Sequence, residues 1–321
     1  MDLSSGKTFW NHTFKGWTYP SLNENVDCDV LIIGSGSSGA HCAYFLSETN
    51  VSVVLVDQRE ICSGSTKANT GLLQYSNDAM LSTLINGFGK KAAVRHYQLC
   101  KEAIETLEQK VVPTLEENSD FKIRKSLYFA SSENDLEKLR KEYYTLKKYG
   151  FPVEFLWENQ IEEKFSFSKP GAIVTDGDAE LNPYKHAQLL IHYALNNGTK
   201  IFSNTKINGR KQMKDSTVLY TDNGFEIKAK YIIYATGYES QEIKKDPNGQ
   251  VVSSYAISTN VIENLPGWYD DMMIWETARP YIYARRTKEN RIVFGGLDES
   301  TIHKKKETPC LYINEIFYWR S

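Results

Sequence analysis

Residues 29–39 read DVLIIGSGSSG, and this stretch decides the fold. Its opening, DVLII, is a short apolar run of the kind that forms a fully buried parallel strand. A helix is expected from about Ser38 to Ser47, and residues 51–56 (VSVVLV) predict a second strand. Strand, glycine-rich turn, helix and strand in this order predict an α/β fold with a parallel, doubly wound sheet. Further along the chain, Asn182 is expected to cap a helix that runs from Pro183 to Asn197. Residues 217–221 and 225–230 are expected to form a hairpin across residues 222–224, followed by another strand at residues 231–235.

The three glycines of this stretch complete a GxGxxG pattern, and each has its own physical role. Gly34 permits the tight turn, Gly36 lets the backbone approach a pyrophosphate, and Gly39 lets helix and strand pack closely. The helix N-terminus near Ser38 adds N–H groups and a partial positive charge that favour phosphate. The pattern predicts a dinucleotide-binding loop, and a glycine-rich turn that binds nothing is the alternative.

An acidic residue at the end of the second strand narrows the choice of dinucleotide. Asp57 can accept hydrogen bonds from ribose hydroxyls, and its charge would repel a 2′-phosphate. We therefore expect FAD or NAD rather than NADP. Gln58, the next residue, is assigned to the same cofactor-binding set.

Two further segments are rich in the small residues that lie along a cofactor. Residues 63–73 read SGSTKANTGLL, and the apolar strand at residues 231–238 runs into Ala-Thr-Gly (YIIYATGY). Small side chains let the backbone come close to a ligand. An ordinary surface loop is the alternative for either segment taken alone.

Together these motifs resemble the FAD-dependent amino-acid and amine oxidases of the D-amino-acid oxidase superfamily. The order is GxGxxG, an acid, SGSTxxNxG and an ATG strand end, and the resemblance covers about Tyr19 to Ser300. The aromatic arm at residues 19–22 (YPSL) and the Asn182-Pro183 pair are similar to the γ-glutamylputrescine oxidase branch. The resemblance implies a Rossmann-like FAD-binding domain with an interleaved, mainly antiparallel α+β substrate domain.

The resemblance also implies FAD contacts at matching positions, from the adenine to the flavin ring. They are the backbone of Ile207 at the adenine, Asp57 at the ribose, Gly34, Gly36 and Gly39 at the pyrophosphate, Ser65 and Thr66 at phosphate, Ala235, Thr236 and Gly237 near the phosphate end, and Asn69, Gly71 and Leu72 near the flavin ring.

On the substrate side, the chain has a single GxGxxG, which argues against a second nucleotide domain for NADPH. Electrons are therefore expected to come directly from an organic substrate. Strand alternation places Tyr281, Tyr283 and Arg285 on one face. This strand resembles the Tyr-x-x-Pro-Arg strand of glycine oxidase, whose arginine clamps the substrate carboxylate, with Ala284 in place of the proline. The alternative is that Arg285 is a solvated charge at the strand edge.

The predicted reaction is oxidation of a C–N bond in an amino acid or amine by hydride transfer to FAD, giving an imine that hydrolyses. A positioned flavin needs little acid–base help for this step, so the protein mainly orients and desolvates. Oxygen is the expected acceptor, with a quinone or a carrier protein as alternatives. Leu72-Leu73-Gln74 replaces the basic residues of sarcosine oxidase, which makes sarcosine a doubtful substrate. The rival functions are a hydroxy-acid or glycerol-3-phosphate dehydrogenase and a truncated, inactive remnant.

We expect two interleaved domains. Their ranges are 1–77 and 150–238 for the FAD-binding domain, and 78–149 and 239–300 for the substrate domain. The superfamily usually continues past Gly295-Gly296-Leu297-Asp298 with a final segment, whereas residues 301–321 form an atypical, aromatic tail. The expectation is a chain truncated by a frameshift near Lys305 that binds FAD weakly or not at all.

Bulk composition excludes several classes of function. With 41% hydrophobic and 24% charged residues and a net charge of −2, the chain is expected to be a cytoplasmic globular protein that binds no nucleic acid. Its five cysteines form no CxxC pair and indicate a reducing compartment. No apolar run is long enough for a membrane span. His186 and His192 are expected on different sides of one helix, so no metal is predicted.

Overall fold

The computed structural model describes residues 6–247, 249 and 251–300, and the chain divides into two compact units, each assembled from three separate segments. Unit 1 comprises Met1–Asn69, Thr114–Ser119 and Asn182–Gln250. Unit 2 comprises Thr70–Pro113, Asp120–Leu181 and Val251–Ser321. The predicted tail, residues 301–321, lies outside the described residues.

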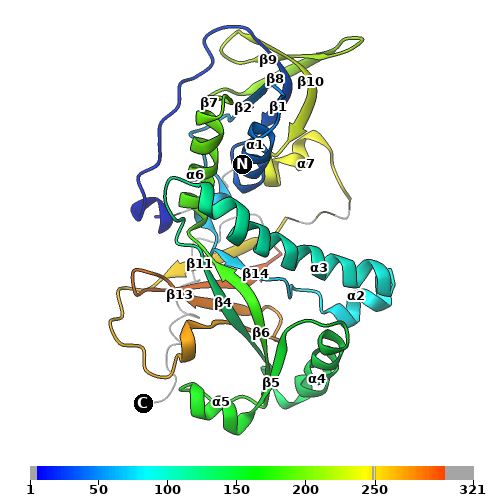
Figure 1. The fold of residues 1–321 in the computed structure, drawn as a ribbon, viewed down its shortest axis with the longest axis vertical. Coiled ribbons are helices and arrows are strands. Elements are labelled where there is room, and N and C mark those ends of the chain that lie inside the picture. Colours follow the sequence, from blue (N-terminus) through cyan, green and yellow to red (C-terminus); the bar gives the residue numbers. More distant parts are fainter. Residues whose placement is uncertain (1–5, 248, 250, 301–321) are drawn as a thin grey trace. The chain divides into compact units, whose positions relative to one another are not determined.

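Unit 1 is built on a six-stranded sheet with the order β7-β2-β1-β10-β9-β8 (Figure 1). The strands are β1 (Val26–Ile33), β2 (Val53–Val56), β7 (Lys200–Phe202), β8 (Ile207–Gln212), β9 (Thr217–Thr221) and β10 (Glu226–Tyr234). Strands β7, β2, β1 and β10 are parallel, and every residue of β2 is buried. The predicted βαβ unit and buried parallel strands are therefore confirmed.

The antiparallel edge of this sheet follows from turn chemistry. Residues 222–224 (Asp-Asn-Gly) connect β9 to β10, and Gly224 has a φ of +85°. The predicted hairpin is confirmed. The sequence indicated two strands between residues 225 and 235, but the structure has a single one, because β10 pairs with β9 through its first half and with β1 along most of its length.

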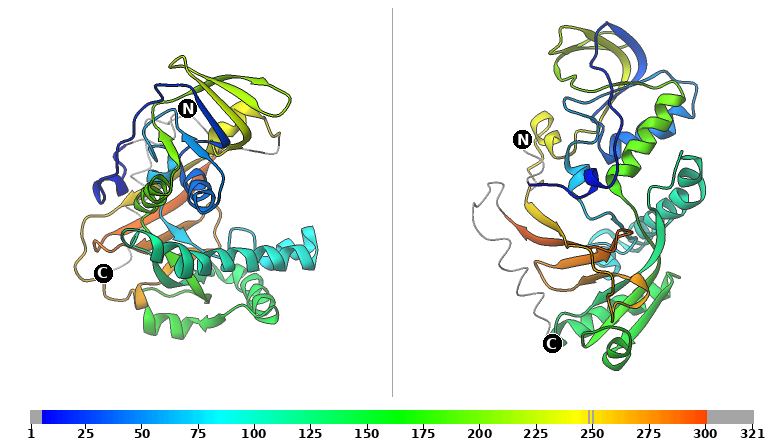
Figure 2. Two further views of the ribbon diagram at one scale, coloured as in Figure 1. Left: turned by 45° about the horizontal axis from the view of Figure 1, so that its top comes forward. Right: turned by 90° about the vertical axis from the view of Figure 1, so that its left-hand side faces the viewer.

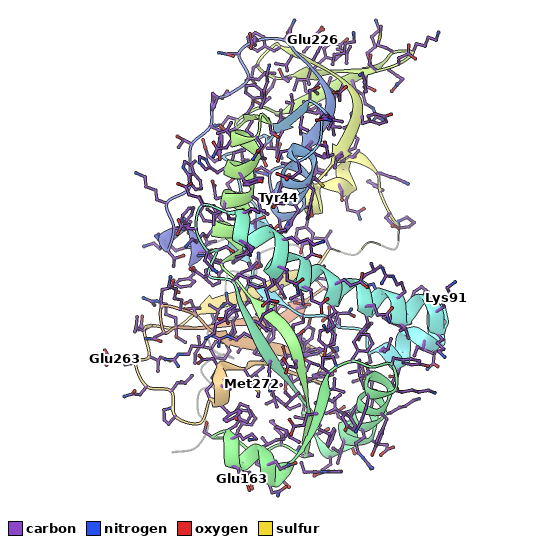
Figure 3. The ribbon with its side chains drawn as sticks, in the orientation of Figure 1. Tyr44, Lys91, Glu163, Glu226, Glu263 and Met272 are labelled. Atoms are coloured by element: carbon purple, nitrogen blue, oxygen red, sulfur yellow. The ribbon has the colours of Figure 1, made fainter. Side chains whose placement is uncertain are left out.

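Helices α1 (Ser37–Ser47) and α6 (Pro183–Asn196) run side by side in unit 1 (Figures 1 and 2). Tyr44 of α1, labelled in Figure 3, lies between them, and its ring centroid is 4.7 Å from that of Tyr193 on α6. The predicted cap of α6 is confirmed, since Oδ1 of Asn182 accepts a hydrogen bond from the Lys185 amide at 3.0 Å. A short helix, α7 (Ser240–Ile243), follows β10.

Unit 2 is built on an eight-stranded sheet with the order β11-β14-β13-β12-β4-β6-β3, in which β5 also pairs with β6. The strands are β3 (Leu72–Leu73), β4 (Lys122–Phe129), β5 (Val153–Trp157), β6 (Gly171–Glu180), β11 (Ser253–Ser258), β12 (Met273–Glu276), β13 (Ile282–Arg286) and β14 (Ile292–Glu299). Only β4 and β12 pair in parallel, so the prediction of a mainly antiparallel second sheet is confirmed.

The helices of unit 2 belong to the segments between these strands. They are α2 (Leu81–Phe88), α3 (Lys90–Thr106), α4 (Glu133–Lys148) and α5 (Glu158–Lys164). The aromatic core beside them includes Tyr75 and Tyr97, neither of which is exposed. The ring centroids of Tyr75 and Phe151 lie 5.6 Å apart, and those of Tyr128 and Trp275 lie 3.7 Å apart in a stacked arrangement.

One expected boundary differs from the structure. Residues 150–181 were expected to belong to the FAD-binding domain. In the structure β5 and β6 lie in the second sheet, where β6 pairs with both β4 and β5. Unit 2 therefore extends to Leu181, and unit 1 resumes at the Asn182 cap.

Candidate functional site

The glycine loop in unit 1 lies where three main-chain segments meet at the end of the parallel strands. A Cβ on Gly39 would lie 1.9 Å from the carbonyl oxygen of Gly34. Gly34 itself has a φ of +104°, and a Cβ there would lie 2.4 Å from the carbonyl oxygen of Ala235. Both positions need glycine because neighbouring main chain fills the space of a side chain, as the motif predicted.

Main-chain donors at this loop point away from the protein's own acceptors. Among residues 6–247, 249 and 251–300, none accepts a hydrogen bond from the N–H of Gly36, Ser38 or Gly39. Gly36 is the N-cap of α1 and has no side-chain cap. Unpaired N–H groups at the positive end of a helix form a site for an anion such as a pyrophosphate.

Asp57 holds this loop in place through Ser35. Its Oδ2 accepts hydrogen bonds from the Ser35 amide at 2.8 Å and the Ser35 hydroxyl at 2.6 Å, and its Oδ1 accepts one from the Arg59 amide at 2.9 Å. Carboxylate oxygens have further lone pairs, so these contacts leave room for a ribose hydroxyl. Sequence reasoning missed Ser35, since the motif leaves its position free. The neighbouring Gln58 donates to Glu239.

The segment that follows, η2 (Ser65–Ala68), contacts the loop through Thr66. Oγ1 of Thr66 accepts a hydrogen bond from the Ser37 amide at 3.0 Å, which leaves its own proton to donate. The Asn69 side chain donates to the Thr66 carbonyl at 2.8 Å, and Nε1 of Trp10 donates to the Asn69 carbonyl at 2.6 Å. Trp10, which precedes β1 in the chain, thus supports this segment, a role that the sequence did not indicate.

The end of β10 supplies the other side of the loop. The Ala235 amide donates to the Ile33 carbonyl at 2.8 Å, which continues the pairing of β10 with β1. Thr236 follows, and its Oγ1 is buried without a hydrogen-bond partner among the described residues. Buried polar atoms normally have partners, so this hydroxyl points to a ligand that completes the site. Gly237 begins the next turn at a φ of +56°, and Ile207 begins β8.

Two residues expected beside the flavin ring belong to unit 2. Gly71 has a φ of +71°, and its carbonyl accepts a hydrogen bond from the Leu181 amide at 3.1 Å. Leu72 begins β3 and pairs with Glu180 of β6. These contacts hold residues 71–73 as an extra strand on the second sheet.

Tyr281 and Tyr283 lie together, with ring centroids 5.6 Å apart. The Tyr281 hydroxyl donates to Oδ1 of Asp78 at 2.6 Å, and burial is the main reason that the pKa of each phenol is raised. Tyr283 pairs with Gly295 across the sheet, and a Cβ on Gly295 would lie 2.4 Å from the Tyr283 ring. The predicted shared face of the two tyrosines is present, with Gly295 making room for one ring.

The alternative interpretation of Arg285, as a solvated charge at the strand edge, is wrong, because the residue is only 3% exposed. Its Nε donates to the Thr70 carbonyl at 2.6 Å and its Nη2 to the Leu181 carbonyl at 2.7 Å. Its Nη1 lies 3.3 Å from Oε2 of Glu180. Burial lowers the pKa of this guanidinium, and Glu180 opposes that shift. The role as a clamp for a substrate carboxylate stays a prediction.

The described residues contain neither a metal-binding group of side chains nor a helix that could span a membrane. No group of three or more His, Cys, Asp and Glu side chains in the described part of the chain is arranged to hold a metal ion. The helices in that part are also too short or too polar for any of them to cross a bilayer.

The family described as "DAO: FAD dependent oxidoreductase" matches residues 29–312. The chain belongs to this family. The description of the DAO family names an FAD-dependent oxidoreductase, and the unpaired donors of the glycine loop together with the Thr236 hydroxyl fit that cofactor.

Two curated proteins illustrate the relationship within the DAO family. YhfW of Bacillus subtilis (strain 168), whose name describes a Rieske 2Fe-2S iron-sulfur protein, is 23% identical over 227 residues, which is 71% of this chain and 43% of YhfW. Gamma-glutamylputrescine oxidoreductase of Escherichia coli (strain K12) is 23% identical over 291 residues, which is 87% of this chain and 66% of the relative. The chain therefore spans less than two thirds of the length of each.

Solved structures share the fold at low sequence identity. Glycine oxidase from Geobacillus kaustophilus has a TM-score of 0.68 at 17% identity, covering 89% of this chain and 75% of its own. L-alpha-glycerophosphate oxidase from Mycoplasma pneumoniae, solved with FAD bound, has a TM-score of 0.69 at 18% identity, covering 90% and 77%. The predicted FAD-dependent fold is confirmed, while these two oxidases act on different classes of substrate.

Proposed function

We propose that the protein is an FAD-dependent oxidoreductase that oxidises a C–N bond of an amino acid or amine. The observation that carries the FAD part is the glycine loop, where three N–H groups lack acceptors among the described residues. The C–N part is supported by the similarity to gamma-glutamylputrescine oxidoreductase, whose name gives an amine derivative as the compound it acts on.

In this proposal each part of the chain has a separate task. The amides of Gly36, Ser38 and Gly39 bind the pyrophosphate, and the Thr236 hydroxyl donates to the same region. Asp57 keeps the loop rigid through Ser35 and accepts a ribose hydroxyl. Bound FAD supplies the hydride acceptor, which is the chemistry that side chains lack.

Two tyrosines are proposed to orient the substrate: Tyr283 in β13, and Tyr281, which immediately precedes β13. Tyr281 and Tyr283 present neighbouring aromatic rings, and their phenols stay protonated because burial raises the pKa of each. The neutral Tyr283 phenol can donate to a substrate oxygen or accept from an amine without placing a charge near the reacting carbon. The Tyr281 hydroxyl, which donates to Asp78, can still accept from an amine. Oxygen is the proposed electron acceptor.

A second candidate is oxidation of a hydroxyl-bearing carbon, as in a glycerol-3-phosphate or hydroxy-acid dehydrogenase. The structural similarity to L-alpha-glycerophosphate oxidase is as high as that to glycine oxidase, so the fold does not separate the two. A third candidate is a binding protein without activity.

The deciding experiment is the visible spectrum of the purified, FAD-supplemented chain, recorded without oxygen before and after each substrate is added. The panel contains amines, amino acids, hydroxy acids and glycerol-3-phosphate. Bleaching by an amine or amino acid alone supports the proposal, and bleaching by glycerol-3-phosphate or a hydroxy acid supports the second candidate. A protein that binds FAD and bleaches with none of them contradicts both. A Tyr283→Leu variant is the matched control, since it removes a proposed substrate contact and leaves the glycine loop intact.

A further inference from the structure

We infer that Arg285 is a positioning residue that acts on the flavin-side segment rather than on the substrate. Its guanidinium holds the main-chain carbonyls of Thr70 and Leu181, and so fixes residues 71–73, of which Gly71 and Leu72 are expected to lie near the flavin ring. The inference rests on the proposed function and deepens it by assigning this arginine a different task.

The geometry uses the whole guanidinium. Nε donates to the Thr70 carbonyl at 2.6 Å, Nη2 donates to the Leu181 carbonyl at 2.7 Å, and Nη1 faces Glu180 at 3.3 Å. The fork of an arginine is rigid and planar, so these three partners fix its orientation. Arg285, Thr70 and Leu181 are 3%, 6% and 5% exposed, which shields all of these contacts from water.

The two carbonyls belong to residues at which the chain passes from one unit to the other. Thr70 is the first residue of unit 2 after the chain leaves unit 1, and Leu181 is the last residue of unit 2 before the chain returns. Their segments also pair with each other, because the Leu181 amide donates to the Gly71 carbonyl at 3.1 Å and Leu72 pairs with Glu180. Arg285 therefore joins both crossing points at the end of the short strand β3.

The charged side chains around Arg285 are connected by ion pairs. Glu180 lies between two arginines, with Nη2 of Arg124 at 2.8 Å and Nη1 of Arg285 at 3.3 Å. Arg124 also approaches Asp271 at 3.5 Å. Removing Arg285 would leave two carbonyls and part of a buried carboxylate without their donor, and a lysine ammonium could not reach all three acceptors in one plane.

A clamp for a substrate carboxylate makes a different demand on the same residue. It needs a pair of parallel N–H groups facing the ligand, whereas here the same nitrogens donate to Thr70, Leu181 and Glu180. The two roles can be separated, because a clamp affects only substrates with a carboxylate, while a positioning residue affects the flavin before any substrate is present.

The test compares Arg285→Lys with Arg286→Lys as the matched control. Arg286 is the next residue of β13, and its side chain is 25% exposed and pairs with Asp271 and Asn290. We expect Arg285→Lys to weaken FAD binding about tenfold and to shift the flavin spectrum and midpoint potential, whereas the control leaves all three unchanged. For any substrate that bleaches the flavin, the change in KM is expected to be equal with and without a carboxylate.

The opposite pattern overturns the inference. Unchanged FAD affinity, spectrum and potential, with a rise in KM confined to carboxylate-bearing substrates, would make Arg285 the substrate clamp. Amide hydrogen exchange of residues 70–73 gives a reading that is independent of FAD and of any substrate. Faster exchange there in Arg285→Lys supports the inference even if the proposed reaction fails, and unchanged exchange contradicts it. Glu180→Gln, which keeps Arg285 and both carbonyl contacts, is a milder second variant and should show a smaller effect in the same direction.

Discussion

The glycine loop of unit 1 and the Arg285 cluster of unit 2 differ in whether their polar groups have hydrogen-bond partners within the protein. At the glycine loop, three main-chain N–H groups have no acceptor among the described residues, and the Thr236 hydroxyl is buried without a partner. In the Arg285 cluster, which consists of Arg285 with Thr70, Glu180 and Leu181, every nitrogen of the Arg285 guanidinium donates to a protein acceptor. The difference suggests that the first region is arranged to receive a ligand and the second to hold the chain in place.

Gly39→Ala should break the first region with the largest effect. The new Cβ would lie 1.9 Å from the Gly34 carbonyl oxygen, and main chain cannot move aside as a flexible side chain can. We expect a loss of several kcal/mol in the free energy of unfolding, or failure to fold, because severe overpacking costs about 1–3 kcal/mol or more. Thermal unfolding followed by circular dichroism measures the loss.

Gly87→Ala is the control for this prediction. Gly87 lies within α2, and a Cβ there would meet nothing within 4 Å. In a helix alanine is more favourable than glycine by about 0.8–1.0 kcal/mol, so this variant should be as stable as the parent protein or more so. Equal melting temperatures for the two variants would show that the close approach at Gly39 does not matter.

The sequence alone could predict the glycine loop but not the role of Arg285, and the reason is physical. Gly34 and Gly39 could be predicted because their role depends on a few neighbouring residues and on one strand end. The role of Arg285 could not, because its partners Thr70, Glu180 and Leu181 come together only when β3, β6 and β13 form one sheet.

The same reason explains other successes and errors. The Asn182 cap and the turn at residues 222–224 depend on local chemistry, and both were predicted. The assignment of residues 150–181 was wrong because strand patterning does not say which sheet a strand will join. The role of Ser35 was missed because only the folded loop places its hydroxyl against Asp57.

Asp57→Asn tests whether the carboxylate of Asp57 orders the main chain of the glycine loop, whose unpaired N–H groups are proposed to bind FAD. An amide offers one acceptor oxygen in place of two, so either the contacts of Ser35 or that of Arg59 would be lost. Hydrogen bonds to a charged group contribute about 1.5–3 kcal/mol each, and we expect roughly 2–3 kcal/mol lower stability and weaker FAD binding. Titration with FAD and urea unfolding measure both. Asp215→Asn, at an exposed position, should change neither, and an unaltered Asp57→Asn protein would contradict the role of this carboxylate.

His186 extends the comparison to a buried group in unit 1 that is kept neutral. It is 3% exposed, and burial lowers its pKa to about 3. In the unfolded chain a histidine takes up a proton below about pH 6.5, so the folded state loses stability as the pH falls from that value toward 3. Between pH 7.5 and 5 this loss is on the order of 2 kcal/mol.

His186→Gln should therefore lose less stability than the parent protein between pH 7.5 and 5. Urea unfolding of both proteins at the two pH values measures the difference, and other titrating groups cancel in the comparison. His192→Gln on the same helix is the control for the loss of a histidine side chain as such, since the His192 side chain is 21% exposed. Parallel losses in His186→Gln and the parent would mean that His186 is protonated in the folded state.

Asp178, in unit 2, is expected to have the smallest effect on stability. Its stability contribution changes with pH in the opposite direction to that of His186. It is fully buried, accepts hydrogen bonds from the Tyr75 amide at 3.0 Å and the Thr175 hydroxyl at 2.5 Å, and burial raises its pKa to about 6. Because the folded state holds this proton more tightly than the unfolded chain, stability falls as the pH rises from about 4 through 6 and is then constant.

Asp178→Asn removes this titration and keeps the shape of the side chain. From pH 5 to 7.5 we expect the variant to gain about 1 kcal/mol relative to the parent protein, measured by urea unfolding at both pH values. Asp215→Asn is the control, because Asp215 lies at an exposed position. A variant that instead lost stability toward pH 7.5 would mean that Asp178 is charged and stabilised in the folded state. Asp178 would then resemble Glu180, two residues along β6, which forms ion pairs with Arg124 and Arg285.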